Sequence, residues 1–423
     1  MKKPSQPMSL LRTIAKLSSF GFLIFGLSGL IDQTFSQELK DTQHMHAMHE
    51  RSNGCESKEL ECANAATPAL LRDGSLLLTW TAGGAVSVAK SRDGGRTFGA
   101  RIQIADHQKF LDTGGDARPQ IVADDLGHVM VAYGYFKDSH WNAKINFATS
   151  KDFGAHFSAV KPLIQQGESE RFPVLALDAQ NMVHVAWIDK RVVAQKNRAG
   201  KPTLGASVAY TNTSNWGDSF KTETIVNAET CECCRIGMGL DLQDRAALAY
   251  RAIFSGGVRD HAFQWVGNGE KPSSIMRISI DNWVTDVCPH QGPSVSFSNS
   301  GVVHATWFTL GEKRHGLFYA RSDNGGITFS DPVKIGRDEF NPSRAFTLAS
   351  GQNVWLVWKE FDGTQSKVFV RKSLDDGLSW SDSFEVSKTQ GYSDHPLLLQ
   401  RQNQVFLSWY TRADGYQLIA LGE

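Results

Sequence analysis

Cysteine is scarce in this chain, and half of it stands in one short segment. The 423 residues contain six cysteines, and TCECCRIGMG holds Cys231, Cys233 and Cys234. Cys288 and His290 follow in the segment CPHQG. Thiolates and imidazoles are the ligands that copper(I) and zinc prefer. One prediction is therefore a soft-metal site, with His395 of the segment SDH as a further ligand.

Disulfides and a redox-active thiol pair are two other interpretations of the same cysteines. The number of cysteines is even, so Cys55 could pair with Cys62 and Cys288 with a member of the cluster. The three clustered cysteines stand too close for easy mutual bridging, because a disulfide requires a specific Cα separation. A strained bond between the adjacent pair is the exception. All three interpretations stay open.

A second group of soft ligands lies near the N-terminus. The segment HMHAMHE contains His44, Met45, His46, Met48 and His49. Imidazole together with thioether favours copper over zinc. The spacing defines no coordination geometry, so we expect this tail to collect or pass on an ion. No organic cofactor is expected.

Charge and the N-terminal segment indicate where the protein works. Its 44 basic and 44 acidic residues cancel, which argues against nucleic-acid or anionic-membrane binding. Residues 1–36 combine a basic start, the apolar segment FGFLIFGLSGLI and a small residue, Ser36, as expected of a signal peptide. An uncleaved membrane anchor is the alternative. We predict export to the periplasm or the cell exterior, without a membrane span in the mature protein.

The elements that must position the cysteines belong to a repeat. Five segments place a hydroxyl residue, then Asp or Asn, then Gly and then an aromatic residue in the same order. They are SRDGGRTF, SKDFGAHF, TSNWGDSF, SDNGGITF and SLDDGLSW, beginning at Ser91, Ser150, Thr213, Ser322 and Ser373. We expect tight turns in which Asp or Asn accepts backbone hydrogen bonds, Gly has a positive φ and the aromatic residue enters the core.

A second repeat interleaves with these turns. Seven segments have the order strand, polar turn, strand, and each apolar run ends in Trp or Tyr. They begin at Pro68, Pro119, Pro173, Gly237, Pro293, Ser343 and Pro396. The pattern predicts an all-β fold, a β-propeller of four-stranded blades. Seven blades are favoured and six are the alternative, with a strand before Pro68 completing the last blade.

The division of the chain follows from these repeats. We expect a signal peptide over 1–36, a flexible His/Met-rich segment over 37–54 and one propeller domain over 55–423.

The turn segments resemble the Asp-boxes, or BNR repeats, of the sialidase superfamily over nearly all of the domain. The resemblance implies a propeller, and sialidase activity only if the site is present, since fold does not fix function. In that family three arginines bind the substrate carboxylate, and the first belongs to an Arg-Ile-Pro motif. Ala66 stands at that place here, whereas Arg118, Arg171 and Arg344 are candidates for a rearranged triad.

The family nucleophile is a tyrosine assisted by a glutamate. No tyrosine of this chain matches that motif; Tyr250 and Tyr392 are candidates by proximity alone.

Part of the chain also resembles a subgroup of exported, sialidase-like BNR proteins. The shared features are the CECC run, Arg259–Asp260, Trp283 and Cys288–Pro289, within about residues 230 to 330. The resemblance carries no chemistry with it, so Arg259 and Asp260 are only candidates for a catalytic role.

Propeller topology predicts that these residues converge. The loops that enter the blades should meet near the axis, on the face opposite the Asp-box turns. The function we favour is metal binding on that axial face, with copper favoured over zinc. Redox chemistry at the same site is a further possibility. An exo-acting glycoside hydrolase of the sialidase type is the alternative, and a glycan- or protein-binding propeller with structural disulfides is the third. The partner is a metal ion or a glycan or other small molecule, and the oligomeric state is open.

Overall fold

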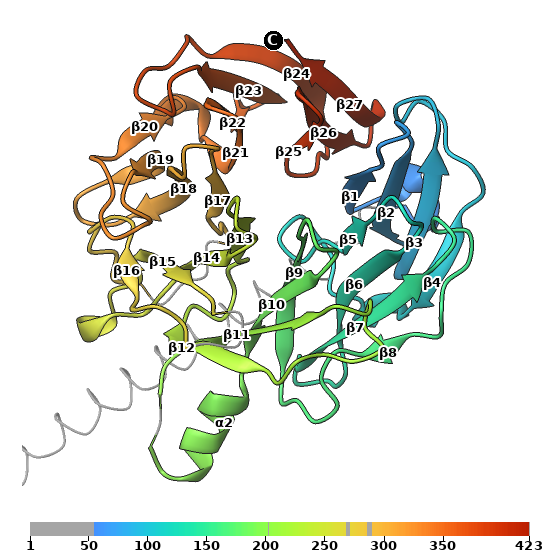
Figure 1. Cartoon of the computed structure of the whole chain (residues 1–423), viewed down its shortest axis with the longest axis horizontal. Coiled ribbons are helices and arrows are strands. Elements are labelled where there is room, and N and C mark those ends of the chain that lie inside the picture. Colours follow the sequence, from blue (N-terminus) through green and yellow to red (C-terminus); the bar gives the residue numbers. More distant parts are fainter. Residues whose placement is uncertain (1–54, 202, 268–270, 286–289, 423) are drawn as a thin grey trace, which may run out of the picture. The chain divides into compact units, whose positions relative to one another are not determined.

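The structure is a computed structural model that describes residues 55–201, 203–267, 271–285 and 290–422. Cys55–Glu423 forms one compact unit. Its described strands form seven antiparallel sheets around a central axis (Figure 1). The predicted all-β propeller is confirmed, with seven blades and not six.

The first three blades each have four strands. Blade 1 contains β1 (Ala65–Leu70), β2 (Leu76–Ala82), β3 (Ala85–Ser91) and β4 (Ile102–Asp106). Blade 2 contains β5 (Gln120–Ala123), β6 (Val129–Phe136), β7 (Ala143–Ser150) and β8 (Lys161–Pro162). Blade 3 contains β9 (Glu170–Leu177), β10 (Val183–Asp189), β11 (Ala206–Thr213) and β12 (Thr224–Thr230).

The next three blades repeat this order. Blade 4 contains β13 (Gly237–Leu240), β14 (Ala246–Arg251), β15 (His261–Trp265) and β16 (Met276–Arg277). Blade 5 contains β17 (Ser294–Phe297), β18 (Val303–Leu310), β19 (His315–Ser322) and β20 (Val333–Ile335). Blade 6 contains β21 (Ser343–Ser350), β22 (Asn353–Phe361), β23 (Gln365–Ser373) and β24 (Phe384–Gln390).

Helical structure is confined to the connections. The α-helix α2 (Arg191–Arg198) leaves blade 3 between β10 and β11. The short 3-10 helices are η1 (Leu60–Cys62), η2 (Gln108–Phe110), η3 (Ser255–Gly257) and η4 (Asp338–Phe340). No helix in the described part of the chain has the length and hydropathy needed to cross a membrane.

Blade 7 differs from the prediction. It contains β25 (Leu397–Arg401), β26 (Gln404–Thr411) and β27 (Gly415–Leu421), and among the described residues no fourth strand joins them. The segment before Pro68 does not pair with β27, so the expected closing strand was wrong for residues 55–64. That segment instead packs beside β26, where the Tyr410 hydroxyl donates to the Glu61 carbonyl over 2.7 Å. The first strands of blades 1 and 7 also touch and close the ring.

The second strand of every blade carries the aromatic residue that ends its apolar run. These side chains are Trp80, Tyr133, Trp187, Tyr250, Trp307, Trp358 and Trp409, and each is less than 2% exposed. Large aromatic side chains dominate core energetics because each removes a large apolar area from water. The predicted strand pattern is therefore confirmed in the packing.

The five repeated turns have the predicted geometry. In the first, the Ser91 hydroxyl donates to the Asp93 carboxylate over 2.8 Å and accepts the Gly95 N–H over 2.8 Å. Asp93 also accepts the Thr97 N–H over 2.9 Å. The same glycine in each turn has a positive φ, between 79° and 85°. We call these five segments the box turns.

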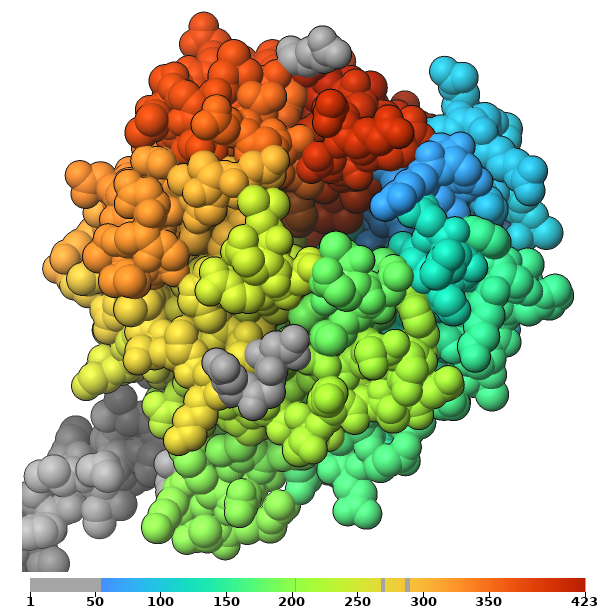
Figure 2. All heavy atoms as spheres, viewed as in Figure 1, coloured from blue at the N-terminus to red at the C-terminus, as the bar shows by residue number. Residues whose placement is uncertain are grey.

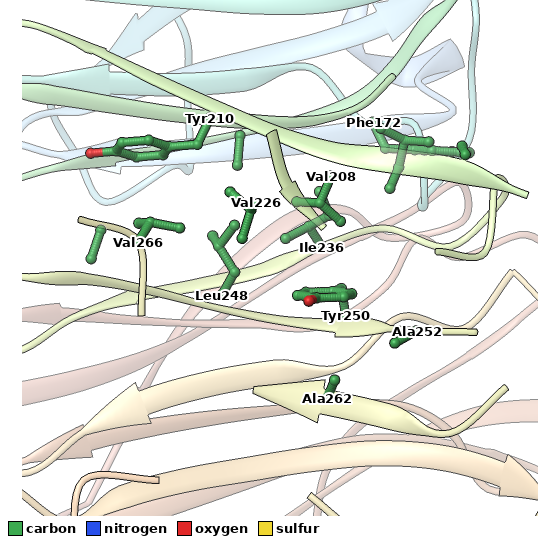
Figure 3. Close-up of a cluster of buried hydrophobic side chains, with 14 of the residues drawn as sticks. Phe172, Val208, Tyr210, Val226, Ile236, Leu248, Tyr250, Ala252, Ala262 and Val266 are labelled. Carbon is green, nitrogen blue, oxygen red and sulfur yellow. The ribbon is translucent and has the colours of Figure 1, made fainter. Parts of the chain in front are cut away.

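Blades 3 and 4 share an apolar core that holds the cysteine segment in place. Phe172, Val208, Leu248 and Tyr250 pack together there (Figure 3). Ile236, which is 4% exposed, belongs to the same core and stands two residues after Cys234. Burial of Ile236 therefore fixes the end of the cysteine segment against the body of the propeller.

Candidate functional site

Strand register places the blade entry loops and the box turns on opposite faces. In blade 1, Ala65 at the start of β1 lies opposite Thr81, near the end of β2. Ser91, which opens the box turn, lies opposite Leu76 at the other end of β2. In blade 4 the Cys231 N–H donates to the Arg251 carbonyl at the end of β14, which is the entry side. The predicted separation of the cysteine segment from the box turns is confirmed.

The three clustered cysteines form a buried sulfur cluster. Cys231, Cys233 and Cys234 are 1%, 5% and 2% exposed, and their Sγ atoms all lie within 4.8 Å of one another. The Cys231 and Cys233 sulfurs are 3.4 Å apart, and the Cys234 thiol donates to the Cys231 sulfur over 3.5 Å. This group could hold a metal ion.

The cysteines of the cluster are in different states. Cys231 and Cys234 are free thiols, whereas Cys233 is disulfide-bonded. A vicinal bond between Cys233 and Cys234 is therefore ruled out. We expected the clustered cysteines to stand too close along the chain for easy bridging. The turn between Cys231 and Cys234 nevertheless brings their two sulfurs into contact. Elsewhere, Cys55 and Cys62 form a disulfide.

The contact between the free thiols separates their acidities. The pKa of Cys231 is lowered to about 6, chiefly by the hydrogen bond from the Cys234 thiol and further by the Arg251 and Arg259 guanidiniums, against the effect of burial. The pKa of Cys234 is raised well above its usual value because this thiol donates the shared hydrogen and is buried. The shared hydrogen therefore stays on Cys234, and Cys231 is the sulfur that ionises first.

Two arginines flank the sulfurs. Arg251 Nη1 lies 3.8 Å from Cys234 Sγ, and Arg259 Nη1 lies 4.0 Å from Cys231 Sγ. Arg251 is 1% exposed, stacks 3.8 Å from the Trp283 ring and donates through Nε to the Arg259 carbonyl. The cluster is thus built from the cysteine segment, the end of β14 and the loop that contains Trp283.

Asp260, a candidate for a catalytic role, makes hydrogen bonds that order a loop. It accepts backbone N–H groups of Asp281, Asn282 and Trp283 and lies 3.4 Å from Arg277. Asp260 therefore holds the loop that carries Trp283. A part of the site that the sequence did not indicate is His261, buried opposite Arg251 across the β14–β15 pairing.

Among the described residues, the sulfur group that could hold an ion includes neither His290 nor His395. His395 lies among the charged groups at the axis, where burial and Arg344 hold its pKa well below the usual value. His290 is half-buried and has a φ of 50°. Cys288 lies outside the described residues, as do His44, Met45, His46, Met48 and His49 of the tail.

The second group of interest is an axial basic cluster, made of Arg118, Arg235, Arg344 and Lys359 with Asp116 and Asp394. Its members come from the entry loops of blades 2, 4 and 7 and from strands β21 and β22. The Arg118 Nη2–Asp394 Oδ1 distance is 2.6 Å, and the Arg344 Nη1–Asp116 Oδ2 distance is 2.7 Å. Four cationic side chains face two carboxylates. Figure 2 shows one face of the ring, which is hollowed at the axis.

Crowded positive charge and burial shift the acidities in the axial basic cluster. Burial, followed by Arg344, lowers the pKa of Lys359 to about 8. Burial lowers the pKa of Arg235 to about 10, although Asp116 opposes the shift. Arg235 Nε and His395 Nδ1 have no hydrogen-bond partner among the described residues. The cluster therefore carries an excess of positive charge with donors to spare.

The candidates for a sialidase-type triad are already engaged. Arg118 is 5% exposed and donates to Asp394 and to the carbonyls of Gly115, Ala66 and His395. Arg171 donates through Nε and Nη2 to both Asp112 oxygens, at 2.8 and 3.0 Å. Arg118 therefore has few donors left for a substrate carboxylate, and Arg171 already pairs with a carboxylate of the protein.

The two tyrosine candidates are equally enclosed. The Tyr250 hydroxyl donates to Gln264 and the Tyr392 hydroxyl to the Asn64 carbonyl, and burial raises both pKa values.

A cavity of about 550 Å³ lies away from both clusters. The turn residues Asp178, Gln180 and Asp244 line it together with Trp265. These turns are on the face of the box turns, in the region where blade 4 lacks a box turn. The cavity is therefore separate from the sulfur cluster.

Comparison with known proteins supports the fold and goes no further. No protein-family model and no curated protein matches the chain. A solved polysaccharide lyase, an ulvan lyase bound to -[GlcA(1-4)Rha3S]-, matches at 10% identity and a TM-score of 0.55 over 86% of this chain and 95% of its own. A leech intramolecular trans-sialidase matches at 13% identity and a TM-score of 0.44, over 87% of this chain and 68% of its own. An α-L-arabinofuranosidase from Fusarium graminearum matches at 14% identity and a TM-score of 0.46, over 86% of this chain and 94% of its own. The match to the ulvan lyase, the one of these three with a TM-score above 0.5, bears on the fold alone.

Proposed function

We propose that this protein is an exported propeller that binds a soft metal ion, copper(I) before zinc, through Cys231 and Cys234. The observation that carries the proposal is the pair of buried free thiols whose sulfurs are 3.5 Å apart. Thiolates are soft ligands, and each thiol that loses its proton to a metal gains a strong bond. One thiol of the pair is already acidic, which lowers the cost of ionisation.

Ligand number and charge favour copper(I). Structural zinc takes four ligands, whereas the described residues bring three sulfurs together, and Cys233 is disulfide-bonded. Two thiolates around copper(I) carry one net negative charge. The Arg251 and Arg259 guanidiniums, 3.8 and 4.0 Å from the sulfurs, would stabilise that charge.

Export and the N-terminal tail complete this proposal. Free thiols do not persist easily in an oxidising compartment, and a bound metal would protect them. Residues 44–49 offer imidazole and thioether ligands, so we propose that the tail collects the ion for the sulfur cluster.

The test is metal binding by the reduced protein without oxygen. Copper(I) should raise the unfolding temperature, because a ligand at about 100 times its Kd stabilises a fold by about 2.7 kcal/mol. Replacing Cys231→Ser with Cys234→Ser should abolish the rise, whereas deleting residues 37–54 should leave most of it. The matched control removes the remote disulfide, Cys55→Ser with Cys62→Ser, and should keep the metal-dependent rise. Absence of metal beyond what the tail binds would refute the proposal.

The axial basic cluster favours a second candidate function, the binding of an acidic glycan. Arg344 and Lys359 lie in a group with more positive than negative charge, and guanidiniums pair well with carboxylate and sulfate. The ulvan lyase of similar fold is bound to a glucuronate- and sulfate-containing saccharide, which suggests the ligand class to try. Thermal shifts with glucuronate and sulfate should disappear in Arg344→Met and persist in the surface control Lys151→Met. Equal shifts in both variants would reject this candidate.

Sialidase activity is the weaker alternative. Because Arg118 and Arg171 already pair with Asp394 and Asp112 and Ala66 replaces the family arginine, we expect no appreciable turnover of a fluorogenic sialoside. Efficient cleavage that is lost in Arg171→Met would reverse this ranking.

A further inference from the structure

The two free thiols of the sulfur cluster have the spacing of an oxidisable pair. Cys231 and Cys234 are three positions apart, as in a C-x-x-C motif, and the Cys234 thiol points its hydrogen at the Cys231 sulfur. Thiols in such motifs form a single disulfide readily. We propose that this dithiol reduces a small hydroperoxide, with Cys231 as the attacking sulfur and Cys234 as the resolving thiol.

Two buried side chains that face each other across β14 and β15 have nitrogens without hydrogen-bond partners among the described residues. Arg251 is 1% exposed, and its Nη2 has no hydrogen-bond partner in the described part of the chain. His261 is also 1% exposed, and neither of its ring nitrogens has a hydrogen-bond partner among the described residues. Leaving a buried polar group without a partner destabilises the fold. These groups therefore indicate a place for a small molecule that accepts hydrogen bonds.

Burial restricts the oxidant to a small neutral molecule. Cys231 and Cys234 are 1% and 2% exposed, so the disulfide of a partner protein would have no access to them. A hydroperoxide carries no charge to desolvate, and both of its oxygens accept hydrogen bonds. Its leaving oxygen becomes negative as the O–O bond breaks. The free Nη2 of Arg251 is placed to stabilise that charge, in the way an oxyanion hole does.

The reaction consumes two thiols and one peroxide. The Cys231 sulfur attacks a peroxide oxygen, an S–O bond forms and the O–O bond breaks. The leaving oxygen takes a proton from the thiol pair and departs as water or an alcohol, and Cys231 becomes a sulfenic acid. The Cys234 sulfur, now a thiolate, attacks the Cys231 sulfur and the S–O bond breaks. The displaced hydroxyl group takes a proton from solvent and leaves as water. Two electrons pass from the sulfurs to the peroxide, and a disulfide remains.

Cys233 is not the resolving residue, although its sulfur is only 3.4 Å from Cys231. It is disulfide-bonded, so it has no thiol to offer. Cys234 is the free thiol in contact with Cys231, which assigns the second step to it.

The experiment treats the reduced full chain with hydrogen peroxide in the presence of a metal chelator. Mass spectrometry should show the loss of two hydrogens and a new link between Cys231 and Cys234. The reaction should be about tenfold or more faster than that of glutathione at the same pH. In Cys234→Ser the product should stop at a sulfenic acid on Cys231 that dimedone traps, and Cys231→Ser should show neither product.

Arginine variants test whether the peroxide reaction depends on the proposed site or only on the accessibility of the thiols. Arg251→Met should slow the first step about tenfold or more, as expected when a stabilising donor is removed. The control Arg245→Met changes an arginine that is 62% exposed on the opposite face, and it should react as the wild type does. A wild-type rate no greater than that of glutathione, or a disulfide formed equally in Cys234→Ser, would overturn the proposal. Because metal is removed, failure here leaves the copper proposal to its own test.

Discussion

At the scale of single residues, one shared hydrogen bond gives two neighbouring thiols opposite shifts in pKa. Cys231 and Cys234 have the same side chain and lie in contact, but one accepts the shared hydrogen and the other donates it. The pKa of the accepting thiol is lowered because the hydrogen bond stabilises its charged form, and the pKa of the donating thiol is raised. Both the metal and the peroxide proposals rest on the contact between these two free thiols.

The ultraviolet absorbance of thiolate should measure this asymmetry. In the wild type, titrated against Cys231→Ser as the blank, absorbance should rise with a midpoint near the pKa of about 6 that the Cys234 hydrogen bond produces. In Cys234→Ala the midpoint should move up, because the largest stabilising contact is gone while burial remains. A wild-type midpoint near that of a free thiol, about 8.5, would contradict the described contact.

Glu170 provides a separate test through stability. It is fully buried, and neither carboxylate oxygen has a partner among the described residues; burial and then Asp189 raise its pKa to about 7. A raised pKa in the folded state gives stability that is complete below the unfolded value and is lost as pH rises through about 7. The loss should be on the order of 3 kcal/mol.

Glu170→Gln should remove this pH dependence, because the amide cannot ionise. Urea unfolding at pH 5 and pH 8 should show a larger fall in the free energy of unfolding for the wild type than for the variant. Parallel losses in both proteins would mean that Glu170 is not protonated in the fold.

At the scale of elements, local patterns were predictable and loop paths were not. The box turns follow from residue type alone, because Ser, Asp and Gly make their bonds within a few positions. The strands β22 and β26, whose apolar runs end in Trp358 and Trp409, follow from periodicity. The contact of Cys231 with Cys234 depends on the turn between them, which no periodicity describes. His395 was predicted as a metal ligand, but its position among arginines depends on which entry loops cross the axis.

Gly377 in the last box turn tests what the turn contributes. It has a φ of 79°, and an added Cβ would overlap the Tyr319 hydroxyl. Gly377→Ala should therefore cost about 1–2 kcal/mol for its backbone and about 1–3 kcal/mol more for overpacking. The control Gly351→Ala has a φ of 65° with open space around the Cβ, so it should show the backbone cost alone. Equal losses in chemical denaturation would show that the contact with Tyr319 relaxes freely.

At the scale of the whole molecule, ion pairs join loops that are far apart in sequence. Arg118 and Asp394 are separated by 276 positions, and their pair is buried at the axis. Asp394 also accepts the Ala66 N–H over 2.8 Å, so one carboxylate links blades 1, 2 and 7. Propeller topology predicts that entry loops meet, because all of them lie at the same end of the blades. It does not predict which charges pair, since that depends on side-chain positions within each loop.

Replacing Asp394→Asn should weaken the closure of the ring. The change leaves the Arg118 guanidinium buried without its counter-charge, and breaking a buried pair costs about 3–5 kcal/mol. The control Asp218→Asn removes a pair at 4.0 Å whose side chains are 72% and 63% exposed, and it should cost well under about 1 kcal/mol. The double variant Arg118→Gln with Asp394→Asn should recover part of the loss, because no uncompensated charge remains. Denaturant unfolding of the four proteins measures these differences. A small effect of Asp394→Asn, with no recovery in the double variant, would mean that the apolar contacts between neighbouring blades close the ring without this pair.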